Sequence, residues 1–198
     1  MATPTVLLVG TGRSAFQLGH ALKRGKARLV GVVGRDPVKA KALARQLKCD
    51  AFAFGDPFPK SHLILVAVSD DAIAAVSKRL PKTSAVVAHT SGAQGLQALG
   101  KHAQRGVLWP IQSLSAGEPV DLSAVPIVID SNGREARAVL LDVARRISST
   151  VIELPQKQRE GLHLAATIAS NLPVFLLGEA GRLLKAQNLD PVLLIPLW

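Results

Sequence analysis

The residues with the clearest chemical meaning form a glycine-rich hexapeptide near the start of the chain. It follows the apolar run of residues 5–9 and consists of Gly10, Thr11, Gly12, Arg13, Ser14 and Ala15. In this Gly-x-Gly-x-x-Ala pattern one glycine makes a tight turn, the second lets the backbone approach a pyrophosphate, and the small third residue allows close helix–strand contact. The same glycines could serve a turn alone. Their place between an expected strand and an expected helix, whose free N–H groups attract phosphates, predicts a dinucleotide site.

The residue after the second apolar run bears on which dinucleotide would bind. An NAD site usually has an acidic residue at the end of the second strand, where it binds the ribose hydroxyls. Here that run ends in Arg35, whose planar guanidinium suits a 2′-phosphate, and Arg13 in the glycine loop could assist it. Asp36 leaves the alternative open, because it could bind the ribose itself. The pattern favours NADP.

The end of the third apolar run should also lie along the cofactor. Ligands of parallel sheets bind beyond the carboxyl ends of the strands, which places Val68 and Ser69 beside the dinucleotide. The two residues that follow, Asp70 and Asp71, are expected to cap a helix beginning at Ala72 rather than to act as acids in chemistry.

Groups able to transfer a proton follow the next predicted strand. His89, Thr90, Ser91 and Gly92 offer an imidazole, two hydroxyls and a flexible backbone beside the expected nicotinamide position. Such groups can hold a carbonyl or imine and pass a proton while a hydride is transferred. The alternative, given equal weight, is a polar turn without a catalytic role.

A second pair of polar residues interrupts an alanine-rich segment further along. His163 and Asn171 are eight residues apart, a little over two helical turns, so they share roughly one helix face. We predict that they close the cleft over the nicotinamide. The alternative is that both are buried polar side chains satisfied by the backbone. A serine-hydrolase site is not indicated, because no Gly-x-Ser-x-Gly elbow occurs.

The elements expected to position these residues alternate along the chain. Helices are predicted at residues 14–25, 37–48, 70–80 and 134–148, and strands at residues 5–10, 27–35, 62–70, 84–88, 125–130 and 151–155. After Gly106 the pattern loosens before the fifth of these strands. This alternation predicts an α/β fold, a Rossmann-type doubly wound, mainly parallel sheet.

The character of the chain changes near residue 155. Residues 156–198 have helical periodicity, interrupted at Pro173, and no strand pattern. We therefore place a dinucleotide-binding domain at 1–155 and the start of an all-helical domain at 156–198. The last six residues, LLIPLW, are apolar and lack a helix stop signal. We expect that this helical domain is truncated, or that a partner subunit covers its apolar surface.

Composition restricts the class of protein. The 198 residues are 48% hydrophobic, which is enough for a packed core, and the single Cys49 fits a reducing, cytoplasmic setting without structural zinc. Neither a signal peptide nor an apolar run of about 18–20 residues is recognised, so no membrane is expected. The net charge of +10 attracts anions, but its dispersed basic residues and 4% aromatic content argue against nucleic acid.

Several motifs together resemble one family. They are the glycine loop, VAVSDDAI, HTSGA, the Pro-x-Gln-Ser segment after Gly106, and HLAATIASN. They resemble Rossmann-like proteins with a DUF2520 C-terminal domain, distant relatives of pyrroline-5-carboxylate reductase and of F420-dependent NADP oxidoreductases. The resemblance implies an NADP-binding domain, a helical domain that usually forms a homodimer, and an active cleft between them.

The chain departs from that family at two places. Members usually have His-Pro where this chain has Trp109-Pro110, so the role of that histidine is lost or has passed to His89 or His163. Members also continue for several more helices beyond the position of Trp198.

Two functions follow from these motifs. The first is an NADP-dependent oxidoreductase acting on a small carbonyl or imine compound, with no metal and with these catalytic candidates: His89, Ser91, His163 and Asn171. The second is a dinucleotide-binding sensor or interaction protein without catalysis, which Trp109 favours. We predict the first.

Overall fold

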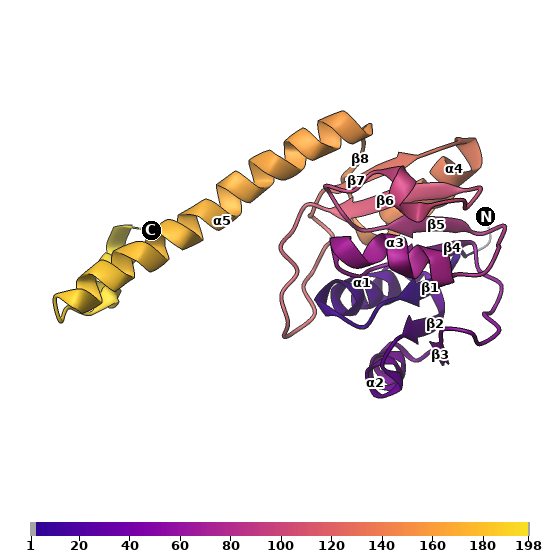
Figure 1. Ribbon diagram of the computed structural model, residues 1–198, viewed down its shortest axis with the longest axis horizontal. Coiled ribbons are helices and arrows are strands. Elements are labelled where there is room, and N and C mark those ends of the chain that lie inside the picture. The colour runs from indigo at the N-terminus through magenta and orange to yellow at the C-terminus, as the bar shows by residue number, and fades with distance from the viewer. Residues whose placement is uncertain (1–2, 198) are drawn as a thin grey trace.

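A computed structural model describes residues 3–197 and centres on an eight-stranded sheet. The strands lie in the order β3-β2-β1-β4-β5-β6-β7-β8 (Figure 1). They are β1 (Thr5–Val9), β2 (Arg28–Gly34), β3 (Ala51–Ala53), β4 (Leu63–Val66), β5 (Val86–His89), β6 (Arg105–Pro110), β7 (Ile127–Ser131) and β8 (Val151–Glu153). The helices are α1 (Arg13–Arg24), α2 (Pro37–Leu47), α3 (Asp70–Arg79), α4 (Arg134–Ile147) and α5 (Gln156–Ala186), with two 3-10 helices, η1 (Leu96–Leu99) and η2 (Pro191–Leu197).

Two hydrophobic cores hold the helices on opposite faces of the sheet. Helices α1, α2 and α4 pack on one face, and α3 and η1 pack on the other. The central strands β1 and β4 are almost continuously apolar because both of their faces are covered. Helix α1 buries Ala15, Leu18 and Leu22 at the three- and four-residue spacing of an apolar stripe. The predicted α/β fold with a mainly parallel doubly wound sheet is confirmed.

Two strands escaped prediction. Strand β3 is only three residues long, and two of them are alanines, which carry little strand preference. Strand β6 contains a glycine and ends in a proline, both typical of turns, yet its residues after Arg105 are buried. It pairs antiparallel with β7, the one antiparallel pair in the described sheet. Residues 111–126 form the loop between β6 and β7.

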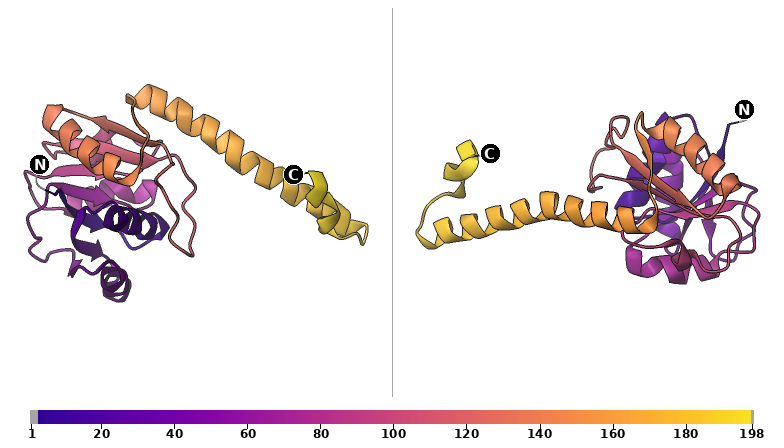
Figure 2. Two further views of the ribbon diagram at one scale, coloured as in Figure 1. Left: turned by 180° about the vertical axis from the view of Figure 1, so that it is seen from behind. Right: turned by 90° about the horizontal axis from the view of Figure 1, so that it is seen from above.

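Helix α5 projects away from the sheet, as both views in Figure 2 show. It is 31 residues long and continues through Pro173, where the sequence predicted an interruption. Only Arg159 and Gly181 are buried along it. Its exposed apolar side chains are Leu164, Ile168, Leu172, Val174, Phe175, Leu176 and Leu183.

The composition of α5 bears on the expectation that no membrane is involved. Among the described helices it is the one long and apolar enough to cross a membrane, with a mean hydropathy of 1.4 over an 18-residue window, none of which is buried. No unbroken apolar run marks this segment in the sequence, because histidine, serine, threonine and asparagine are dispersed through it. Length and composition alone do not distinguish a membrane span from a packing face that another chain covers.

Candidate functional site

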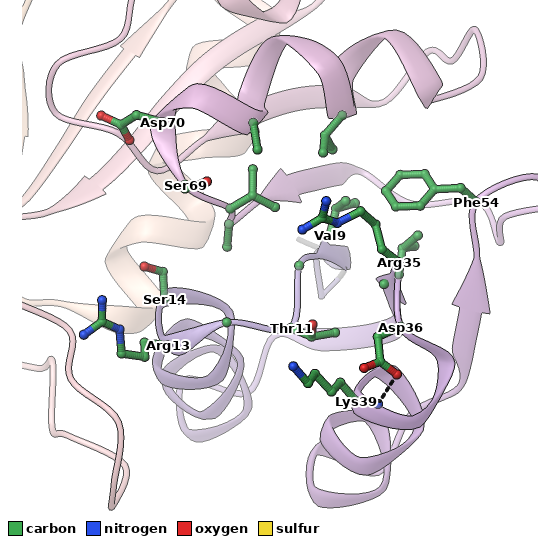
Figure 3. A pocket seen from close by; sticks show the side chains of 18 residues that line it. Val9, Thr11, Arg13, Ser14, Arg35, Asp36, Lys39, Phe54, Ser69 and Asp70 are labelled. Atoms are coloured by element: carbon green, nitrogen blue, oxygen red, sulfur yellow. Dashed lines mark hydrogen bonds between the residues drawn. The ribbon is translucent and has the colours of Figure 1, made fainter.

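A pocket of about 690 Å³ opens at the carboxyl ends of β1, β2 and β4, where the strand order reverses around β1 (Figure 3). This is the switch point at which doubly wound sheets bind ligands. All eight predicted cofactor residues line it: Gly10, Thr11, Gly12, Arg13, Ser14, Arg35, Val68 and Ser69. The structure therefore brings together, in one cavity, segments far apart in the sequence.

Gly10 and Gly12 of the loop are glycines for different structural reasons. Gly10 has a φ of +130°, which side chains rarely adopt, and an added Cβ would collide with the carbonyl of Ala67. Gly12 precedes α1 with a φ of −85°, and an added Cβ would meet nothing within 4 Å. No side chain caps α1 at Gly12, so the first N–H groups of the helix face the pocket without a capping acceptor. This is the arrangement that binds a pyrophosphate.

The end of the pocket formed by the carboxyl end of β2 and the start of α2 carries positive charge. Arg35 lines it, and so does Lys39 of α2, which the sequence analysis missed (Figure 3). Asp36 instead caps α2, since its Oδ1 accepts hydrogen bonds from the N–H groups of Val38 at 2.9 Å and Lys39 at 3.2 Å. Asp36 also lines the pocket, and capping engages only its Oδ1, so the alternative in which Asp36 binds the ribose stays open beside the two basic side chains. Lys39 could have been predicted from Pro37, because Pro37 starts α2 and so places residue 39 in the first turn of that helix.

His89 is fully buried and both of its ring nitrogens contact the backbone. Nδ1 accepts a hydrogen bond from the N–H of Ser91 at 3.2 Å, and Nε2 lies 3.3 Å from the carbonyl oxygen of Gly95. Burial lowers the pKa of His89 from 6.5 to about 4. These contacts favour the polar-turn alternative over the predicted proton-transfer role, because a neutral ring with both nitrogens engaged has no free site for a substrate.

The hydroxyl of Ser91 is also committed within the protein. It donates to Oδ2 of Asp70 at 2.7 Å and accepts from the N–H groups of Ala93 at 3.1 Å and Gln94 at 3.0 Å. The expectation that Asp70 and its neighbour cap α3 is wrong. The helix begins at Asp70 itself, Ser69 occupies the cap position, and no side chain caps it. Asp70 lines the pocket, and its bond to Ser91 connects the pocket to the loop that follows β5.

A buried arginine that the sequence analysis missed shapes that loop. Arg159, in the first turn of α5, is 0% exposed, and its Nη1 donates to the carbonyls of Gly92 at 2.8 Å and Gln94 at 2.7 Å. Its Nη2 lies 3.5 Å from Oδ2 of Asp130 on β7. Nε and Nη2 have no hydrogen-bond partner among the described residues. Nothing in the local pattern distinguishes this arginine from the solvated charges around it, so it could not be found from the sequence.

His163 is the predicted catalytic residue that the structure leaves most available. Its ring packs edge-on against Trp109, with centroids 5.5 Å apart, and Gly92 lies so close to both rings that a Cβ there would touch each of them. The side chain is partly exposed, above the carboxyl ends of β5 and β6. Trp109 itself is 8% exposed and packs rather than reaching into solvent.

Asn171 is not brought to this site. It is exposed, and its Oδ1 accepts a hydrogen bond from the hydroxyl of Ser170 at 3.2 Å. Eight residues of helix separate it from His163 by about 12 Å, along the part of α5 that leaves the sheet. Of the four predicted catalytic residues, the structure therefore gathers His89, Ser91 and His163 and leaves Asn171 outside. Within residues 3–197, no cluster of three or more histidine, cysteine or acidic side chains is placed to hold a metal ion.

Comparison with family models agrees with this geometry. The model of a Rossmann-like domain matches residues 2–112, more than half of the chain. The chain belongs to the Rossmann-like family. A second model, the domain of unknown function DUF2520, matches residues 125–198 and so includes β7, α4 and β8 as well as α5. Both matches confirm the resemblance drawn from the motifs. Comparison with curated proteins finds no match.

Solved structures of the same fold come from several bacteria. A protein from Bacteroides fragilis, provisionally assigned as an NADP oxidoreductase, is 28% identical, with a TM-score of 0.86 over 98% of this chain and 77% of that chain. Protein TM1727 from Thermotoga maritima is also 28% identical, with a TM-score of 0.75 over 96% and 73% of the two chains. A 1-pyrroline-5-carboxylate reductase from Streptococcus pyogenes shares the fold at 16% identity, with a TM-score of 0.67 over 94% and 71%. The solved structures of similar fold thus include proteins whose names describe NADP oxidoreductase or reductase activities.

Proposed function

We propose that this chain binds NADP and transfers a hydride between the nicotinamide ring and a small carbonyl or imine compound. The observation that carries the proposal is the switch-point pocket, where Gly12 and the uncapped start of α1 meet the basic side chains of Arg35 and Lys39. The residues fit the cofactor, because Gly12 leaves open space for the pyrophosphate and the first N–H groups of α1 face that space. The bound nicotinamide would supply the hydride chemistry.

The preference for NADP rests on charge at the ribose end of the pocket. Arg35 and Lys39 both line it, and Asp36 is engaged in capping α2. A 2′-phosphate between a guanidinium and an ammonium would form charge-assisted hydrogen bonds. A bare ribose would meet Asp36, whose Oδ1 already accepts the two capping hydrogen bonds, and would leave both cations without an anionic partner, so NAD should bind more weakly.

Within the chain, His163 is the group we assign to proton transfer. It is partly exposed beside Gly92, whereas His89 and Ser91 have their polar atoms engaged within the loop. Its imidazole can bind a carbonyl oxygen or imine nitrogen and transfer a proton to it. His89, Ser91 and Arg159 then hold the loop on which the substrate would rest.

The second candidate function is a cofactor-holding protein without turnover. The contact between Trp109 and His163 over Gly92 favours it, because the indole restricts the space in which a substrate would meet the imidazole. Incubating bound NADPH with a panel of small aldehydes, ketones and cyclic imines separates the two. Oxidation of NADPH that is lost in His163→Ala supports the enzyme, and no oxidation by any compound supports the holding protein.

We further propose a cytoplasmic homodimer that contacts neither nucleic acid nor membrane. The lone cysteine supports a reducing compartment, and the uncovered apolar side chains of α5 support a second copy packed along that helix. Sedimentation in detergent-free buffer at low micromolar concentration should give a dimer. A monomer that partitions into phosphatidylcholine vesicles would instead identify α5 as a membrane segment.

The cofactor preference is tested by titrating NADPH and NADH into three variants. Arg35→Ala and Lys39→Ala each remove one charge-assisted contact, of about 1.5–3 kcal/mol, so each should weaken NADPH binding by about 10-fold to 100-fold and leave NADH nearly unchanged. Lys41→Ala is the control, since Lys41 is an exposed residue of the same helix that does not line the pocket. Equal losses for NADPH and NADH in Arg35→Ala would contradict a 2′-phosphate site.

A further inference from the structure

An aromatic side chain in the cofactor pocket has no role in the function described so far. Phe54 follows β3 directly and lines the pocket beside Arg35, as Figure 3 shows. The two residues are neighbours because β2 and β3 run parallel, with Gly34 paired to Ala53, so each follows one member of that pair. Phe54 therefore lies on the same side of the pocket as the positive charges, away from Ser69 and Asp70.

A cation covers one side of the Phe54 ring. The guanidinium carbon of Arg79, at the end of α3, lies 4.1 Å from the ring centroid. Arg79 does not line the pocket, so the pocket meets the part of the ring that this arginine leaves free. A cation over an aromatic face is an attractive contact that limits the orientations of the ring. The free part of the ring is thus held in place before any ligand arrives.

The rest of this end of the pocket is suited to a flat apolar group. Ala72 and Val76 of α3 line it beside Phe54, and the charged residues Arg35 and Lys39 line it from the side of α2. Arg35 and Lys39 would bind a phosphate, whereas the apolar wall offers no favourable contact to a charged group. A purine base has the size, flatness and π-face that stack on an aromatic ring.

We propose that Phe54, backed by Arg79, is the stacking platform for the adenine base of the dinucleotide. This inference rests on the proposed function, because it assumes that a dinucleotide occupies the pocket. Phe54 contacts the base directly, and Arg79 is a positioning residue that acts through the ring. Part of the affinity for the cofactor then comes from a contact that is independent of the 2′-phosphate and so is shared by NADPH and NADH.

The test compares variants at Phe54 that keep or remove the flat ring. Phe54→Leu keeps an apolar side chain of similar length but lacks the π-face, and Phe54→Tyr keeps the ring. Stacking of a base on an aromatic residue corresponds to about a 5-fold to 100-fold change in affinity. We expect Phe54→Leu to weaken NADPH, NADH and adenosine 2′,5′-bisphosphate by that factor and Phe54→Tyr to bind each ligand within about 2-fold of the wild type. Arg79→Gln should lower the affinity by a smaller factor, of about 2-fold to 5-fold.

Phe58→Leu is the matched control, because Phe58, like Phe54, packs partly buried against the same hydrophobic core but does not line the cofactor pocket. It should bind as the wild type does. The inference is overturned if Phe54→Leu and Phe54→Tyr bind NADPH equally well, or if Phe58→Leu loses as much affinity as Phe54→Leu. A wild-type protein that binds neither NADPH nor NADH would overturn the proposed function itself, which is a different outcome. If Phe54→Leu does not fold, Phe54→Tyr and Arg79→Gln decide. A loss of affinity in Phe54→Tyr, or no loss in Arg79→Gln, contradicts the stacking platform.

Discussion

Replacing each glycine of the phosphate loop by alanine should separate folding from binding. At Gly10 an alanine would have to adopt a φ of +130° and would place its Cβ against the carbonyl of Ala67. The backbone conformation costs about 1–3 kcal/mol and the forced contact about the same again, which gives about 2–6 kcal/mol of lost stability. At Gly12 the φ of −85° suits alanine and the Cβ meets nothing within 4 Å. Gly12→Ala should therefore stay within about 1 kcal/mol of the wild type.

Gly12→Ala should lose affinity for NADPH although it keeps its stability. The open space beside Gly12 is where the pyrophosphate would lie, so a methyl group there excludes it from the N–H groups of α1. We expect Gly12→Ala to fold normally and to bind NADPH at least 10-fold more weakly, a loss of about 1.4 kcal/mol or more. Urea unfolding measures the stability of both variants, and calorimetric titration measures the binding.

One result for each variant would contradict these expectations. If Gly12→Ala binds NADPH as tightly as the wild type, the phosphates do not lie against the start of α1. If Gly10→Ala is as stable as the wild type, then Gly10 is not held in its left-handed conformation against Ala67.

Two further predictions concern the loop after β5. Arg159→Met leaves Asp130 and several carbonyls without their buried partner, so it should lower the free energy of unfolding by about 3–5 kcal/mol; a urea midpoint equal to that of the wild type would show that this arginine does not hold the loop. His89 has a pKa of about 4 in the folded protein against 6.5 ordinarily, so the folded state disfavours its charged form. Stability should therefore fall by up to about 1.4 kcal/mol per pH unit as the pH drops from 6.5 towards 4, and His89→Gln should remove that part of the slope. The free energy of unfolding of both proteins is measured with urea at pH 7, 6 and 5. If it changes with pH equally in the wild type and in His89→Gln, His89 is not buried in its neutral form.

The parts of the fold and site that could be predicted rest on local patterns. Continuous apolar runs indicate β1 and β4, and the glycine spacing between β1 and α1 indicates the phosphate loop. Because parallel strands end at one edge of a sheet, Arg35 and Ser69 could be placed in a single pocket although they lie far apart in the chain. Lys39 could have been added from Pro37, which marks where α2 begins.

The parts that could not be predicted depend on contacts between distant segments. His89 and Ser91 look chemically active in the sequence, and only the fold shows that their polar atoms are engaged within the loop. Arg159 and Asp130 meet through the packing of α5 on β7, for which no local pattern exists. The antiparallel β6 was hidden because its glycine and proline resemble turn residues, while burial in the sheet overrides that preference.

The central claim is that the pocket beside Gly12, Arg35 and Lys39 is a site for NADP. Calorimetric titration of the wild-type protein with NADPH and, separately, with NADH tests it most directly. The structure predicts one NADPH bound per chain, at least 10-fold tighter than NADH. Equal affinities would contradict the role of Arg35 and Lys39, and no heat of binding with either dinucleotide would contradict the site itself.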